Sequence, residues 1–202
     1  MSSQTERLDP GTLLTALGAG AGLSALSRAT AVVFVTLLTI VAAQVSLPLP
    51  FTPVPLTLQP MVVLLGAAAL GPRLGAAAQI LYLALGIVGM PVFAASPVLP
   101  QGVVRLLGPT GGYLMSYPLA AFVTGYLAER GLDRRYLTSV LAMSAGLAII
   151  FTCGVLWLAV GVPHAGLAAA VASGLVPFVL ADIIKLFLAA SILPAAWRLL
   201  RT

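Results

Sequence analysis

Two residues of opposite charge, Asp182 and Lys185, lie within a long apolar stretch near the end of this 202-residue chain. They are three residues apart, so a helix places both side chains on one face. A charged group inside a membrane-spanning helix costs about 2.5–3.5 kcal/mol even on a lenient scale, and such groups are therefore retained mainly for function. We predict that the pair contacts a ligand; the alternative is an ion pair with a purely structural role.

A second group of candidate residues lies in the sequence Gly-Pro-Thr-Gly-Gly-Tyr at 108–113. Glycines allow close approach of the backbone, and free N–H groups at a helix start bind polar or anionic groups. The same motif is also typical of a plain turn before a helix. Aromatic residues with a polar tip suit the wall of a binding site or, equally, the protein core. The candidates from both considerations are Thr110, Gly111, Gly112, Tyr113, Tyr82 and Phe93.

Residue types needed for catalysis are scarce in this chain. It has one histidine, His164, and one cysteine, Cys153, and neither has a cluster of His, Cys, Asp or Glu around it in the sequence. Metal sites and catalytic dyads need such partners. There is no phosphate-binding loop ending in Gly-Lys-Ser/Thr, so the chain cannot hydrolyse ATP by itself. We predict a binding protein without catalytic residues, metal or cofactor, rather than an enzyme.

The segments that must position these residues are apolar enough to cross a membrane. Apolar residues make up 60% of the chain and charged residues 7%, whereas a soluble domain has about 25% charged residues. The longest charge-free gaps hold 44, 31, 23 and 46 residues, and one spanning helix needs about 20. We expect an all-α integral membrane protein, with a tail and short interfacial helix at 1–28 and a six-helix membrane domain at 29–202. The helices are expected at 29–44, 56–70, 74–89, 111–128, 137–160 and 175–197.

The distribution of arginines predicts the orientation of these helices. With both termini in the cytoplasm, eight arginines lie on the cytoplasmic side and only Arg105 lies outside. The net charge of +5 is thus an orientation signal, and no nucleic acid is expected as a partner. The outward loops at 46–55 and 91–110 are rich in proline, which disfavours helix. Because irregular backbone at membrane depth needs protein or a cavity around it, we expect a ligand pocket beneath these loops.

Five stretches of the chain occur in an order and spacing typical of one membrane-protein family. They are QVSLPLPFTPVPLTLQ at 44–59, LGPRLG at 70–75, LYLALGIVGMPVFA at 81–94, LGPTGGY at 107–113 and DIIK at 182–185. In these stretches the chain resembles the BioY family, the biotin-binding substrate (S) components of energy-coupling-factor (ECF) transporters. The resemblance covers residues 32–193.

This resemblance implies a vitamin carrier that crosses the cell membrane several times and binds biotin in an outward-facing pocket. In the family, the acidic and basic residues of the last helix contact biotin, and here these are Asp182 and Lys185. An asparagine of the family's outer loop is absent here, so its contact would pass to Ser96 or Gln101, with Arg105 in the same loop as a further candidate. The implied partners are biotin, a transmembrane coupling (T) subunit, two ABC-type ATPase subunits and the lipid bilayer. The alternatives are an S component for a different vitamin and a membrane-embedded enzyme.

Overall fold

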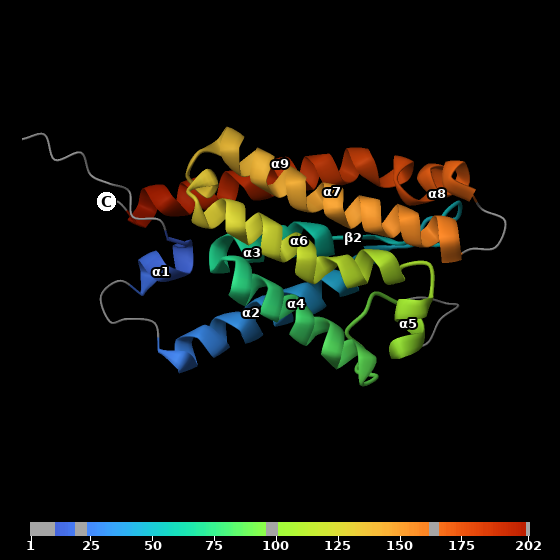
Figure 1. Ribbon diagram of the computed structural model, residues 1–202, viewed down its shortest axis with the longest axis horizontal. Coiled ribbons are helices and arrows are strands. Elements are labelled where there is room, and N and C mark those ends of the chain that lie inside the picture. The colour runs from blue at the N-terminus through green and yellow to red at the C-terminus, as the bar shows by residue number, and fades with distance from the viewer. Residues whose placement is uncertain (1–10, 19–23, 96–100, 162–165, 201–202) are drawn as a thin grey trace, which may run out of the picture.

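The computed structural model describes residues 11–18, 24–95, 101–161 and 166–200, and most of them are helical (Figure 1). The predicted candidate Ser96 and the single histidine, His164, lie outside the described residues. The helices are α1 Leu13–Leu17, α2 Ala25–Gln44, α3 Gln59–Leu70, α4 Pro72–Ile87, α5 Val103–Leu107, α6 Gly111–Glu129, α7 Tyr136–Gly161, α8 Gly166–Gly174 and α9 Val176–Leu200. Short strands β1 Ser46–Leu47 and β2 Leu56–Thr57 and a 3₁₀ helix η1 Leu132–Arg134 complete the described elements.

Six of these helices, α2, α3, α4, α6, α7 and α9, coincide with the expected ones to within four residues at each end. Among the described residues, three of them, α2, α7 and α9, are long and apolar enough to cross a membrane by themselves. Helices α3 and α4 are shorter and also apolar. The all-helical membrane architecture is therefore as expected from the charge-free gaps.

The first expected helix begins earlier than predicted. Its cap is Ser24, whose hydroxyl accepts a hydrogen bond from the backbone N–H of Ser27 at 3.1 Å. A serine in this position satisfies one of the free N–H groups of the first turn. Helix α2 therefore starts at Ala25, and Arg28 belongs to the helix and not to the preceding tail.

The connections that were expected to face outward contain more regular structure than the sequence suggested. The second expected helix starts at Gln59 and not at Leu56, because Leu56–Thr57 pairs antiparallel with Ser46–Leu47 across the proline-rich loop. The connection between the expected helices at 137–160 and 175–197, predicted as a third outward loop at 161–174, contains α8 at Gly166–Gly174. Alanines in this segment favour helix. The segment has no charged residues to mark where a helix begins or ends, so it was not distinguished from a loop.

Helix α6 is the centre of the bundle. It packs against α3, α4 and α7, and Figure 1 shows α7 and α9 on one side of it and α2 and α4 on the other. Its buried positions include Ala120, Ala121, Gly125 and Ala128. Small residues let helix backbones approach closely, which is the main source of helix association inside a membrane.

The two ends of the bundle differ in character. The β1–β2 hairpin, α5 and α8 lie at one end, and α1, the start of α2 and the last turn of α9 lie at the other (Figure 1). At the second end the indole N–H of Trp197 donates a hydrogen bond to the buried Asp133 carboxylate at 2.6 Å. Burial raises the pKa of Asp133, and the indole hydrogen bond partly offsets this. The contact fixes the end of α9 to the α6–α7 connection.

The close approach of α6 to the start of α4 gives a stability prediction. A Cβ atom at Gly125 would lie 2.5 Å from the carbonyl carbon of Gly71 and 2.6 Å from the nitrogen of Pro72, both backbone atoms. Gly125→Ala should therefore destabilise the protein by about 1–3 kcal/mol, the usual cost of overpacking. The control is Gly161→Ala, where the nearest atom to the new Cβ is 3.8 Å away. Melting temperatures in detergent that fall equally in both variants would contradict this packing.

Candidate functional site

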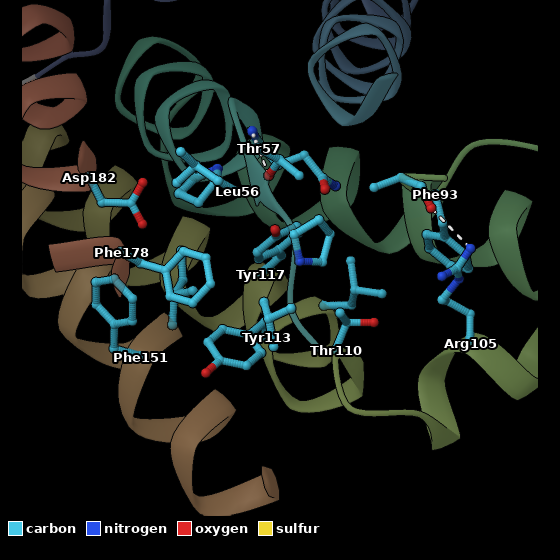
Figure 2. A pocket seen from close by; sticks show the side chains of 17 residues that line it. Leu56, Thr57, Phe93, Arg105, Thr110, Tyr113, Tyr117, Phe151, Phe178 and Asp182 are labelled. Carbon is cyan, nitrogen blue, oxygen red and sulfur yellow. Dashed lines mark hydrogen bonds between the residues drawn. The ribbon is translucent and has the colours of Figure 1, made fainter. Parts of the chain in front are cut away.

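A cavity lies at the hairpin end of the bundle, enclosed by the hairpin, α6, α7, α9 and the connection after α4. Its volume is about 60 Å³. The lining includes Val54, Leu56, Thr57, Gln59, Phe93, Arg105, Thr110, Tyr113, Tyr117, Phe151, Phe178 and Asp182. Figure 2 shows Asp182 on one side of this space and Arg105 and Phe93 on the other, with aromatic rings between them. We call this space the hairpin-end cavity.

Asp182 and Lys185 share one helix face, as their spacing predicted, and form an ion pair with each other, but they have different positions relative to the cavity. Asp182 lines the hairpin-end cavity and is 6% exposed. Lys185 does not line it; the ammonium donates hydrogen bonds to Oδ1 of Asp182 at 2.5 Å and to the backbone carbonyl of Thr57 at 2.7 Å. The lysine therefore neutralises the carboxylate and at the same time connects α9 to strand β2.

The opposite side of the cavity contains hydrogen-bonding atoms without partners. Arg105 is 4% exposed, and its Nη2 donates to the carbonyl of Ala94 at 2.9 Å. Its Nε and the hydroxyl of Thr110 are buried and have no hydrogen-bond partner among the described residues. Burial lowers the pKa of Arg105, but an arginine guanidinium stays protonated in proteins. Buried polar groups are rarely left unpaired, so these atoms are available to a ligand.

Aromatic rings form the apolar wall between the two polar sides. Tyr113, Tyr117 and Phe178 are buried and line the cavity together with Phe93. The hydroxyl of Tyr113 donates to the carbonyl of Gly174 at 2.7 Å, which fixes this ring against α8. Rings held in this way present a rigid apolar surface to a bound molecule.

Tyr82, predicted as a ligand contact, lies behind this wall. It is fully buried and is not part of the lining. The Tyr82 hydroxyl accepts a hydrogen bond from Nε2 of Gln59 at 2.7 Å and donates one to the carbonyl of Val92 at 3.3 Å. Its ring meets the ring of Phe93 edge to face, with the centroids 5.5 Å apart. Tyr82 thus supports Phe93 and Gln59, which do line the cavity.

The remaining predicted contacts stand near the lining but outside it. Gly111 and Gly112 lie at the start of α6, and a Cβ at Gly112 would be 2.2 Å from the Cβ of Trp157. These glycines serve helix packing. Gln101 donates from Nε2 to the carbonyl of Phe93 at 3.3 Å. The structure thus places Phe93, Arg105, Thr110, Tyr113 and Asp182 in the lining and the other described candidates around it.

Two lining residues could have been found by helical spacing but were not singled out. Tyr117 lies four residues after Tyr113, and Phe178 lies four residues before Asp182. Residues four apart share a helix face, so each follows from a neighbour that was selected. A third lining residue, Gln59, is a polar residue at the start of a strongly apolar helix, and this contrast is a weaker indication of a site residue.

The arrangement suits reversible binding better than catalysis. A carboxylate stands on one side, donors without partners stand on the other, and aromatic rings separate them. No group of three or more His, Cys, Asp or Glu side chains that could hold a metal ion occurs within the described residues. The cavity therefore matches an elongated organic molecule with donors at one end and an acceptor, such as a carboxylate, at the other.

The known proteins that are similar to this chain all carry descriptions that refer to biotin transport. The chain is 43% identical over 157 residues to "Biotin transporter BioY" of Thermotoga maritima, covering 78% of this chain and 88% of that protein. It is 42% identical over 148 residues to "Probable biotin transporter BioY" of Pyrococcus horikoshii, covering 73% and 82% respectively. A crystal structure of the S-component for biotin from an ECF-type ABC transporter superposes with a TM-score of 0.77. The identity to that structure is 25%, and the match covers 88% of this chain and 95% of the other.

The family comparison covers nearly the whole chain. The model of the BioY family matches residues 14–202. The matched range includes all the described helices except the first residue of α1, and it contains every residue of the hairpin-end cavity. The chain therefore belongs to the BioY family, whose members are multi-pass membrane components of transporters and not enzymes.

Proposed function

We propose that this protein binds biotin in the hairpin-end cavity and mediates its uptake across the cell membrane. The names of the similar proteins and the matching S-component structure support this substrate. The observation that carries the proposal is the division of polar groups in the cavity. Asp182 is an acceptor on one side, whereas Thr110 and Arg105 have free donors on the other.

Biotin carries complementary groups at its two ends. Its ureido ring has N–H donors that a carboxylate such as that of Asp182 accepts. Its carboxylate at the end of the valeryl chain accepts hydrogen bonds from a hydroxyl and a guanidinium, which Thr110 and Arg105 offer. The sulfur ring and the aliphatic chain then pack against Tyr113, Tyr117 and other aromatic side chains of the wall. We propose this orientation for the bound vitamin.

The cavity must widen to accept the vitamin. Its volume of about 60 Å³ is well below the roughly 300 Å³ at which ligand pockets begin. The wall with the least regular structure is the segment between the two strands of the hairpin. Lys185 binds the carbonyl of Thr57 in the strand that follows this segment, and within the segment the hydroxyl of Thr52 donates to the carbonyl of Ser173 at 2.7 Å. Movement of the hairpin against α8 and α9 is the opening that we propose.

The orientation of the bundle follows from its charges. We propose six membrane-spanning helices, α2, α3, α4, α6, α7 and α9, with both termini in the cytoplasm. Eight arginines then lie on the cytoplasmic side, and the hairpin-end cavity opens to the outside. The residues before α2, which begins at Ala25, then form the cytoplasmic tail, and the membrane domain begins with α2 instead of at residue 29.

Energy for uptake must come from other proteins in this proposal. The chain lacks a phosphate-binding loop for ATP. We propose that a transmembrane coupling (T) subunit and two ABC-type ATPase subunits supply it, which agrees with the ECF-type transporter named for the similar crystal structure.

The proposed orientation of biotin predicts how two variants behave. Calorimetric titration in detergent should show stoichiometric binding of biotin and none of thiamine or riboflavin. Arg105→Gln should weaken biotin binding by about 10- to 100-fold, as expected for loss of a charged hydrogen bond. The same variant should not weaken binding of biotinamide, which lacks the carboxylate. Arg130→Gln, at the other end of α6, is the control and should bind both ligands like the unmodified protein.

Equal losses for biotin and biotinamide in Arg105→Gln would contradict the proposed contact with the carboxylate. Absence of biotin binding by a monodisperse preparation of the unmodified protein would contradict the substrate itself.

The ion pair predicts a non-additive effect on stability. Lys185→Met leaves the buried Asp182 carboxylate without its cation, a change that costs about 3–5 kcal/mol in comparable pairs. Asp182→Asn combined with Lys185→Met removes both charges and should recover much of this loss. Melting temperatures of the single and double variants measure it. A double variant that is less stable than Lys185→Met alone would show that the charges do not depend on each other.

The proposed orientation predicts which loops face outside. Single cysteines at Pro50 and at Gly131 are introduced into a Cys153→Ala background and treated in intact cells with a membrane-impermeant thiol reagent. The cysteine at 50 should react and the cysteine at 131 should react only after the cells are broken. The reverse pattern would mean that the bundle is inverted.

A further inference from the structure

A larger cavity lies at the end of the bundle opposite to the biotin site. Its volume is about 550 Å³, within the range of small-molecule sites. It is bounded by α1, the starts of α2 and α4 and the end of α6. We call it the arginine groove, after Arg28 and Arg73 in its lining.

The two arginines of the groove have no charged partner among the described residues. Both side chains are exposed, and neither guanidinium forms a hydrogen bond or ion pair with any residue that the structure describes. Glu129 is the acidic residue in the lining, and it forms no ion pair with either of them. Arg130 adds a further cation at the rim, where its guanidinium lies 4.1 Å from the ring centre of the lining residue Tyr126.

The positions of these arginines are unfavourable for the helices that carry them. Arg28 is the fourth residue of α2 and Arg73 the second residue of α4. The first turn of a helix has free N–H groups and a partial positive charge, so a cation there is repelled rather than stabilised. An anion bound between the two helix starts would relieve both repulsions at once.

The rest of the groove is apolar. Leu70, Leu74 and Phe122 line it beside the arginines. Phe122 and Tyr126 are 44% and 40% exposed, and their rings stack with centroids 6.4 Å apart. Both residues belong to α6, so this surface continues from the cationic end along the side of the bundle. A site that joins cations to an exposed apolar surface at a helix end fits an amphiphile with an anionic head.

We infer that the arginine groove binds the headgroup of an anionic phospholipid, with the acyl chains lying along Phe122 and Leu74. Free phosphate offers the same headgroup chemistry, but it would use only the arginines and leave the apolar part of the groove uncovered. Basic pockets between membrane helices attract acidic headgroups in this way. The site involves none of the residues that contact biotin in the proposal above.

Native mass spectrometry of the full chain with added phosphatidylglycerol tests this inference, and phosphatidylcholine with the same acyl chains is the neutral comparison. The unmodified protein should retain phosphatidylglycerol in preference to phosphatidylcholine. Arg28→Gln combined with Arg73→Gln should weaken that retention by roughly 30-fold, from about five- to six-fold for each cation. Arg198→Gln, an exposed arginine in the last turn of α9, is the matched control and should change nothing.

A second variant tests the same charges in the opposite direction. Glu129→Gln removes the acid from the lining and should strengthen retention of phosphatidylglycerol several-fold. Equal melting temperatures of all variants in neutral detergent without lipid would show that folding is intact.

Three results would overturn the inference. Equal retention of the two lipids would remove the role of the headgroup charge. Equal effects of the double variant and Arg198→Gln would place the lipid elsewhere on the protein. Displacement of the lipid by the same concentration of glycerol 3-phosphate would assign the groove to a soluble phosphate. Preference for phosphatidylglycerol with the expected order of variants supports the lipid site.

Discussion

The ammonium group of Lys185 connects parts of this protein that are far apart in the sequence. It bonds to the carboxylate of Asp182 one helical turn away and to the carbonyl of Thr57, 128 residues earlier. Without the lysine, the carboxylate would stand uncompensated among apolar helices, and strand β2 would lose its contact with α9. The Asp182 side of the hairpin-end cavity and the position of the hairpin therefore depend on one cation.

The helices around this contact provide a rigid frame. Small buried residues of α6, such as Ala120 and Gly125, let α3, α4 and α7 approach its backbone closely. This packing leaves the hairpin as the non-helical part of the cavity wall, held by the hydrogen bonds of Lys185 and Thr52 and by the buried side chain of Val54. Together with the hairpin movement that we propose, a rigid aromatic wall is a physical basis for enclosing a small molecule and releasing it again.

The helices could be predicted from the sequence because each spanning segment is long, apolar and bounded by charges or prolines. Helix α8 and the hairpin could not, since both are short and depend on packing against the bundle. The spacing of Asp182 and Lys185 correctly placed both on one helix face, but nothing in the sequence pointed from Lys185 to Thr57. As aromatic residues, Tyr82 and Phe93 were both expected to contact the ligand. The fold places Phe93 in the cavity lining and Tyr82 behind it. Contacts between distant segments are thus the part that sequence patterns leave open.

A structure determined with biotin bound tests the central claim most directly, because that claim assigns opposite ends of one ligand to opposite sides of one cavity. The predicted result has the ureido N–H groups within hydrogen-bond distance of Asp182 and the carboxylate beside Thr110 and Arg105. Biotin bound in the reverse direction, or bound outside the hairpin-end cavity, would contradict it.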